Sequence, residues 1–231
     1  MLKLSTTVFA AIAAFAATPA TAANILTDGG FEAQGAASTG NYCYFGFATA
    51  GGPACQSGAW ASNNLGGGLQ VETNGAWPGV PSPDGSFYGF IQAGGSLTQA
   101  FTPTQSGTYS LNWIDAGRPN IGCCAGDQNY YVTIDDGVSL APLLYLGGTT
   151  SFQPWTARQA AFTFGLTAGT AYTLTFQGTS RSDNTAFIDG VSLDLVPGAV
   201  PEPAAWAFML AGFGLVGGAM RRRGAMRVVS A

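Results

Sequence analysis

Residues 96–115, SLTQAFTPTQSGTYSLNWID, hold two segments in which apolar and polar side chains alternate. Leu97 and Phe101 flank Gln99 in the first segment, and residues 108–115 alternate again after the turn signal at 105–107. Because successive side chains of a β-strand point to opposite faces of the sheet, this alternation predicts two strands joined by a turn.

Similar short segments lie on both sides of this stretch, separated by glycine, proline and aspartate turn signals. The predicted strands are 69–72, 86–92, 96–101, 108–115, 129–135, 142–146, 156–164, 171–178 and 185–195, and a short apolar strand in 24–32 precedes them. Residues 33–68 are expected to form long loops, and no helical period of apolar residues precedes residue 204. This pattern predicts an all-β sandwich over residues 24–196.

The N-terminus has the features of a targeting segment. Lys3 is followed by an apolar run at 8–17 and by the small residues Ala20-Thr21-Ala22, which predicts a secretory signal peptide over residues 1–23. An uncleaved anchor helix is the alternative. The chain of 231 residues is therefore expected to be exported, with about 175 residues left for one folded domain.

Export permits disulfide bonds, and the chain has four cysteines: Cys43, Cys55, Cys123 and Cys124. Four cysteines allow three pairings. The leading pair is Cys43–Cys55, which closes a short loop and would leave Cys123–Cys124 as a vicinal disulfide. The other pairings cross-link the two loops. Zinc is disfavoured because the chain has no His and no CxxC spacing.

Charge in the domain is sparse and mostly acidic. Residues 24–199 hold eleven acidic and three basic residues, a net charge of −8, which disfavours nucleic acid as a partner and tolerates divalent cations. The domain lacks His and Lys, the usual general bases and Schiff-base nucleophiles, so we do not expect an enzyme. The alternative is carboxylate chemistry, with Asp115 and Asp127 as a glycosidase pair.

The residues around the second cysteine-bearing loop have two interpretations. Asp115, Arg118, Asp127 and Asn129 flank this loop. We expect a solvated loop rim with an Asp–Arg ion pair, and a polar cleft is the alternative.

The C-terminal region, residues 197–231, is a linker followed by three distinctive elements. These are Pro201-Glu202-Pro203, an uncharged apolar run at 204–220, and a basic tail at 221–231 that begins with Arg221, Arg222 and Arg223. The run is about long enough to form a transmembrane helix, and the arginines would stay cytoplasmic.

In this order, the three elements resemble the PEP-CTERM sorting signal of exported bacterial proteins. The resemblance implies recognition by an exosortase, a membrane sorting enzyme. It also implies transient membrane anchoring and delivery to the cell surface or the extracellular matrix. A plain C-terminal anchor is the alternative.

Two further stretches carry a second resemblance. Residues 24–32, NILTDGGFE, and 185–193, TAFIDGVSL, resemble the first and last strands of galactose-binding-like jelly rolls, which include many carbohydrate-binding modules. The resemblance implies a jelly-roll sandwich, with Glu32 and Asp189 contributing to a structural Ca²⁺ site. Oxygen ligands suit Ca²⁺. The sequence departs from the pattern at Gly190, where a second acidic residue is common. No other cofactor is expected.

Four aromatic residues lie in polar, loop-like stretches where they are hard to explain as core: Tyr42, Tyr44, Trp60 and Trp77. Since Trp and Tyr stack on the apolar faces of sugar rings, we expect them to bind glycan or exopolysaccharide. The alternative is that they cover the end of the sandwich. Trp113 is expected in the core. The sequence thus predicts an exported glycan-binding surface protein. A purely structural surface protein and a glycan-acting hydrolase are the alternatives.

Overall fold

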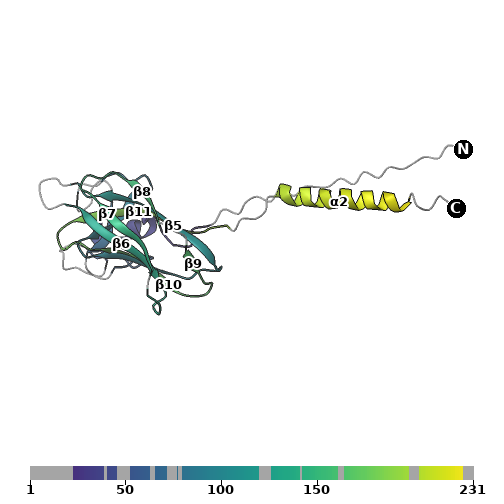
Figure 1. The fold of residues 1–231 in the computed structure, drawn as a ribbon. Coiled ribbons are helices and arrows are strands. Elements are labelled where there is room, and N and C mark those ends of the chain that lie inside the picture. Colours follow the sequence, from purple (N-terminus) through teal and green to yellow (C-terminus); the bar gives the residue numbers. More distant parts are fainter. Residues whose placement is uncertain are drawn as a thin grey trace, which may run out of the picture. The chain divides into compact units, whose positions relative to one another are not determined.

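The computed structural model describes residues 23–38, 41–45, 53–62, 66–71, 77, 80–119, 126–140, 142–160, 164–197 and 203–225. The chain divides into one unit at Ala22–Val196 and a second made of Met1–Thr21 and Pro197–Ala231. Figure 1 shows the strands of the first unit and the helix of the second. The predicted signal peptide lies outside the described residues except for Ala23.

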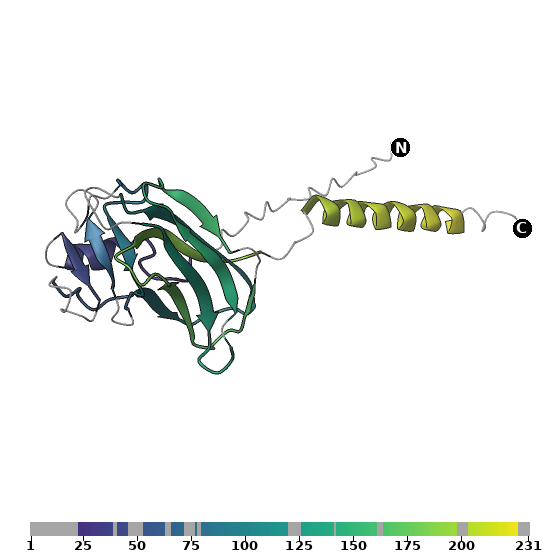
Figure 2. The same cartoon turned by 60° about the vertical axis from the view of Figure 1, so that its left-hand side comes forward.

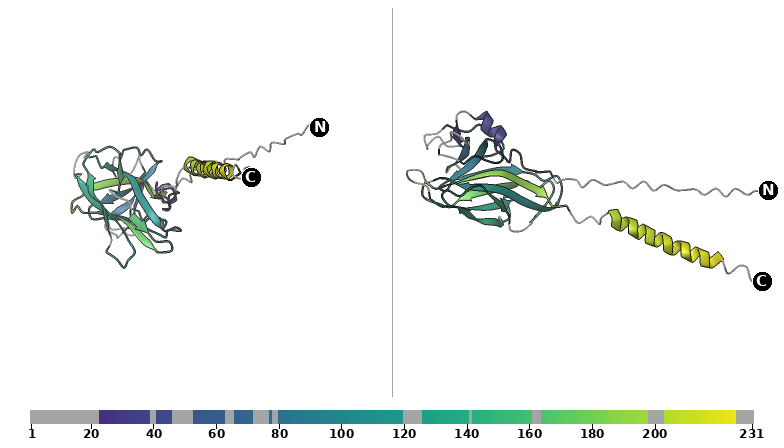
Figure 3. Two further views of the ribbon diagram at one scale, coloured as in Figure 1. Left: turned by 45° about the vertical axis from the view of Figure 1, so that its right-hand side comes forward. Right: turned by 90° about the horizontal axis from the view of Figure 1, so that it is seen from above.

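The strands of the first unit form two antiparallel sheets that lie as layers (Figure 3). The first sheet has the order β1 (Tyr42–Tyr44), β2 (Gly67–Val71), β3 (Phe87–Gln92), β11 (Thr185–Leu195), β5 (Gly107–Gly117) and β8 (Thr156–Gln159), and β9 (Phe164–Leu166) also pairs with β5. The second has the order β4 (Ser96–Phe101), β10 (Tyr172–Gly178), β6 (Gln128–Asp135) and β7 (Leu143–Thr149). The predicted all-β jelly-roll sandwich is confirmed.

Two elements of the N-terminal third differ from the prediction. No strand forms in residues 24–32, although the Ile25 amide donates to the Leu193 carbonyl at 3.0 Å and so keeps this segment beside β11. A short helix, α1 (Glu32–Ala37), follows instead and lies beside the first strands (Figure 2). Its start is fixed by the Asp28 carboxylate, which accepts hydrogen bonds from the amides of Ala33 and Gln34, each at 2.9 Å.

Two strand predictions also need correction. The loop prediction for residues 33–68 missed β1, which pairs with β2. The single strand predicted at 156–164 is two strands, because β8 ends at Gln159 and β9 begins at Phe164.

The main core lies between the two sheets and is rich in aromatic side chains. Trp113 is 2% exposed, and its indole N–H donates to the Tyr130 hydroxyl at 2.9 Å, so its predicted core position is confirmed. The rings of Trp113 and Phe176 meet edge to face at 5.5 Å. Such pairs add about 0.5–1.5 kcal/mol beyond the apolar area that they bury.

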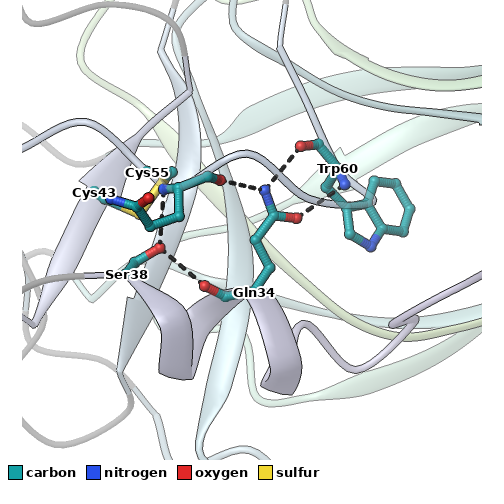
Figure 4. The surroundings of a disulfide bond; sticks show 6 residues. Gln34, Ser38, Cys43, Cys55 and Trp60 are labelled. Carbon is teal, nitrogen blue, oxygen red and sulfur yellow. Dashed lines mark hydrogen bonds between the residues drawn. A yellow bond between two sulfur atoms is a disulfide. The ribbon is translucent and has the colours of Figure 1, made fainter.

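The predicted disulfide between Cys43 and Cys55 is confirmed. Beside it, Gln34 joins α1 to the segment that follows Cys55 (Figure 4). Its side-chain amide donates to the carbonyls of Gln56 at 2.8 Å and Trp60 at 3.0 Å, and its carbonyl accepts from the Trp60 amide at 2.9 Å. Cys123 and Cys124 lie outside the described residues.

The second unit contains one described helix, α2 (Pro203–Ala225). Within the described part of the chain, no helix is long and apolar enough to cross a membrane, which corrects the transmembrane helix predicted at 204–220. Gly212, Gly214, Gly217 and Gly218 interrupt the apolar residues of α2 and contribute no side chain.

Candidate ligand-binding face

A second apolar cluster lies on the outer face of the first sheet, away from the main core. In β3, Tyr88 and Phe90 join this cluster, while Ile91 faces the main core between the sheets. Phe187 of β11 packs beside them, and Tyr88, Phe90 and Phe187 are each 0% exposed. Alternation along the strands therefore gives this sheet an aromatic surface on both faces.

Three of the four aromatic residues predicted to bind ligand gather on this outer face. Tyr44 is buried, and its ring meets that of Phe90 edge to face at 5.2 Å. Tyr42 meets Tyr44 edge to face at 6.2 Å, and Trp77 meets Phe90 at 5.0 Å. Tyr42 and Trp77 are half-buried, so each keeps part of its ring in contact with solvent.

An ion pair borders these rings. The Arg118 guanidinium lies 4.7 Å from the centroid of the Trp77 ring, and its Nη1 donates to Asp183 Oδ1 at 2.9 Å. Gln92 donates to the same Asp183 oxygen and accepts from the Tyr44 hydroxyl at 3.0 Å. Burial raises the pKa of Tyr44, and the neighbouring Tyr42 and Asp183 raise it further, so this phenol stays protonated.

We call Tyr42, Tyr44, Trp77, Arg118 and Asp183 the outer aromatic face. Arg118 is 7% exposed, whereas the Asp183 side chain is 44% exposed and presents its carboxylate to solvent. Half-exposed rings next to a fixed charged pair offer both a stacking surface and hydrogen-bonding groups. Such a surface suits a ligand with apolar faces and hydroxyl groups.

Trp60 does not belong to this face, which corrects its predicted role in ligand binding. Trp60 is 2% exposed and packs against Phe31 within the main core, with the two ring centroids 4.8 Å apart. Its indole N–H donates to the Asp28 carbonyl at 2.8 Å. The loop that carries Trp60 turns inward because the hydrogen bonds of Gln34 hold it against α1.

Asp115 and Asp127 are not brought together as a solvent-accessible pair. Asp115 is 0% exposed and pairs with Arg158, whose Nε lies 3.0 Å from both carboxylate oxygens. Tyr130 and Gln153 also donate to this carboxylate, at 2.7 and 2.8 Å. Burial raises the pKa of Asp115, and the contacts with Tyr130, Arg158 and Gln153 offset part of this rise. The expected solvated rim with an Asp–Arg ion pair among these residues does not form, because Asp115 and Arg118 are buried and each pairs with a residue outside the rim, Asp115 with Arg158 and Arg118 with Asp183.

The residues expected to bind Ca²⁺ lie in an acidic neighbourhood. Burial raises the pKa of Asp189 to about 8, and the charges of Asp84 and Glu32 add to this rise. The Asp84 carboxylate lies close to Gly190: a Cβ atom placed on Gly190 would be 3.3 Å from Asp84 Oδ2. A cation would relieve this repulsion, so the chemistry of the donors fits Ca²⁺.

These carboxylates also have protein partners. Glu32 Oε1 accepts from the amides of Ser86 and Phe87, each at 2.7 Å, and Asp189 accepts from Ser82 and from the Gly190 amide. Among the residues that the structure describes, no group of three His, Cys, Asp or Glu side chains is arranged to hold a metal ion. A shared ion at Glu32 and Asp189 therefore stays a prediction.

The residues of the predicted sorting motif fall partly in the described chain. Pro201 and Glu202 lie outside it, Pro203 begins α2, and Arg221 is exposed near the end of that helix. Arg222 and Arg223 continue the helical backbone.

Sequence reasoning underrated the polar members of the outer aromatic face. It placed Arg118 in a loop rim and gave no role to Gln92. Arg118 is one of only three basic residues between 24 and 199, but the ring that it contacts, Trp77, lies 41 positions away in the chain. The sequence pattern therefore carries no signal for this cation–π contact.

Comparison with known proteins bears on both units. The PEP-CTERM protein-sorting motif matches residues 199–223. No curated protein matches the chain in sequence.

Three solved structures are similar to the chain. A cyclase from Fischerella sp. TAU shares 14% identity over 78% of this chain and 100% of its own, with a TM-score of 0.55. The Stig cyclase Fisc from the same organism, solved with (3Z)-3-(1-methyl-2-pyrrolidinylidene)-3H-indole, shares 16% identity over 77% and 100%, with a TM-score of 0.51. The carbohydrate-binding module TmCBM61, solved with β-1,4-galactotriose, shares 14% identity over 75% and 99%, with a TM-score of 0.47. The chain thus carries the PEP-CTERM protein-sorting motif, a signal of export and sorting to the cell surface, behind a jelly-roll domain that shares its fold with the two cyclases.

Proposed function

We propose that the protein is an exported, non-catalytic surface protein whose jelly-roll domain binds glycan or exopolysaccharide through the outer aromatic face. The observation that carries this proposal is the gathering of Tyr42, Tyr44 and Trp77 beside the Arg118–Asp183 pair. Sugar rings have apolar C–H faces that stack on aromatic rings, and their hydroxyl groups hydrogen-bond to charged side chains. The half-buried rings give the stacking surface, and the exposed Asp183 carboxylate accepts from hydroxyl groups.

The first test is binding of the protein to a glycan array, followed by affinity measurements on the best ligand. Trp77→Ala is expected to weaken binding about tenfold or more, since truncating a tryptophan that anchors an interface typically costs about 2 kcal/mol or more. Tyr131→Ala is the matched control, because Tyr131 is half-buried on β6 of the second sheet. Equal loss in the two variants, or none in Trp77→Ala, would count against the outer aromatic face.

Two observations bear on the alternative functions. The hydrolase hypothesis requires a carboxylate pair in contact with substrate. The buried Asp115 instead pairs with Arg158 and accepts hydrogen bonds from Tyr130 and Gln153. A purely structural protein would need no ligand at all, and it would give no signal on the array. Polysaccharide turnover that disappears in Asp115→Asn would favour the hydrolase instead.

We further propose that an exosortase recognises Pro201-Glu202-Pro203 and processes the tail during export. Glu202→Gln is expected to leave a retained, unprocessed precursor in cells that have the enzyme, because the triplet loses its charged residue. Cell fractionation with an antibody against the domain measures this. Arg227→Gln, which lies beyond the matched residues 199–223, is the control and should be processed normally. Normal processing of Glu202→Gln would contradict the proposal.

The proposed Ca²⁺ site leads to a third test, by thermal unfolding. At a Ca²⁺ concentration about 100 times the Kd, binding to the folded state alone adds about 2.7 kcal/mol. For a domain of this size, this corresponds to a rise in Tm of roughly 5–10 °C over a sample in EDTA. Asp189→Asn should lose the rise, whereas Asp194→Asn, on the same strand, should keep it. No difference between Ca²⁺ and EDTA in the unchanged protein would rule out the site.

A further inference from the structure

The connection between β6 and β7 carries the two most exposed aliphatic side chains in the described part of the domain, and a third exposed one follows at the start of β7. Val138 is 92% exposed, Leu140 is 99% exposed, and Leu143 at the start of β7 is 50% exposed. We call these three residues the aliphatic tip. Exposed apolar side chains grouped in one short segment are typical of interaction surfaces.

The turn that carries the aliphatic tip is fixed by hydrogen bonds. Asp136 Oδ1 accepts from the amides of Val138 at 3.0 Å and Ser139 at 2.7 Å, and Asp135 Oδ1 accepts from the Gly137 amide at 3.0 Å. Gly137 has a φ of +73°, a conformation that glycine adopts without strain. The turn therefore holds Val138 and Leu140 outward in the absence of any partner.

The aliphatic tip lies at the end of the sandwich where the chain leaves the domain. It borders an open hollow of about 210 Å³ that is also lined by Phe164 and Leu166 of β9. β9 pairs with the first residues of β5, where Gly107 opposes Leu166. The Val196 amide donates to the Thr108 carbonyl at 2.8 Å, so the last residue of the domain is at this same end.

We propose that the aliphatic tip rests on the surface of a lipid bilayer. The inference rests on the proposed sorting function, in which a membrane enzyme recognises the tail. The matched motif begins at residue 199, three residues after Val196. Three residues span at most about 11 Å, so an enzyme that holds the motif also holds this end of the domain close to the membrane. Side chains without an apolar partner in the domain then have one in the lipid.

The charges near the tip favour lipid over a second copy of the chain. Two hairpins in contact would bring together the Asp135 and Asp136 carboxylates of both copies, and each domain carries a net charge of −8 over residues 24–199. Like charges oppose that association. A zwitterionic lipid surface carries no such net charge and offers apolar surface to Val138 and Leu140.

The experiment is hydrogen exchange of the full-length protein with and without phosphatidylcholine vesicles. The amides of residues 137–143, except Pro142, which has none, are expected to exchange about tenfold more slowly on vesicles. Val138→Ser/Leu140→Ser should abolish this protection. Leu146→Ser is the matched control, since Leu146 is 69% exposed on β7 and outside the tip, and it should keep the protection.

Three outcomes would overturn the inference. In the first, exchange in 137–143 stays unchanged on vesicles while residues 203–225 become protected. In the second, Leu146→Ser loses the protection as fully as the double variant does. In the third, protection appears without vesicles and rises with protein concentration, which would identify a second copy as the partner. The vesicles contain neither glycan nor exosortase, so failure here is separate from failure of the array and processing tests.

Discussion

Trp60→Ala is expected to lower the free energy of unfolding by about 3–5 kcal/mol, the usual cost of truncating a buried tryptophan to alanine. The indole is 2% exposed, packs between Phe31 and Phe176, and donates to the Asp28 carbonyl. Removing it leaves a cavity in the main core and takes one of two donors from the Asp28 carbonyl, which keeps the Phe31 amide at 3.0 Å. The measurement is equilibrium unfolding in urea.

Trp77→Ala is the matched comparison, because the same residue type is only half-buried there. We expect Trp77→Ala to lower the free energy of unfolding by about 1 kcal/mol or less and to remove most of the ligand affinity. Trp60→Ala should keep its affinity as long as the domain is folded. A reversed pattern, with Trp60→Ala stable but defective in binding, would contradict the assignment of Trp60 to the core.

Arg158→Ala is the second substitution with a large expected effect, a loss of about 3–5 kcal/mol in unfolding free energy. Asp115 is 0% exposed, and Arg158 is the cation that compensates its charge. The Arg158 side chain is 25% exposed, but its removal leaves the fully buried Asp115 charge without a cation. Burial already raises the pKa of Asp115, and loss of Arg158 would raise it further.

Urea unfolding of two further variants separates this effect from a general one. Arg181→Ala removes an exposed arginine and should change stability by no more than about 0.5 kcal/mol. Asp115→Asn/Arg158→Ala removes both charges and should recover part of the loss. If Arg158→Ala lowers the unfolding free energy by less than about 1 kcal/mol, the ion pair with Arg158 is not what stabilises the buried Asp115 carboxylate.

The strands could be predicted because alternation and turn signals are local properties of the sequence. β4 and β11 have the bounds that the sequence predicted, 96–101 and 185–195. α1 could not be predicted in this way, since its six residues are too few for a helical period. Its start depends on Asp28, whose carboxylate reaches the amides of Ala33 and Gln34 only after the glycine turn has formed.

The candidate site was predictable in part. Tyr42, Tyr44 and Trp77 were recognised as aromatics outside an alternating strand, and the outer face of the first sheet gathers them. Trp60 lay in an equally polar stretch, so sequence alone could not separate it from the others. Its inward position depends on contacts with Gln34 and Phe31, which are 26 and 29 positions away in the chain.

The partners of Arg118 could not be predicted either. Asp183 is 65 residues from Arg118 and reaches it because β11 pairs with β5. This pairing places the loop before β11 next to the end of β5. Long-range strand order, which the sequence pattern does not contain, therefore decides which polar groups border the aromatic rings.

The central claim is that the outer aromatic face binds glycan. A crystal structure of the protein with an oligosaccharide selected on the array tests it most directly. We predict a sugar ring within about 4 Å of the Trp77 or Tyr42 side chain, with a hydroxyl group hydrogen-bonded to Asp183. A sugar bound elsewhere on the domain, with Tyr42, Trp77 and Asp183 all free of contact, would contradict the claim.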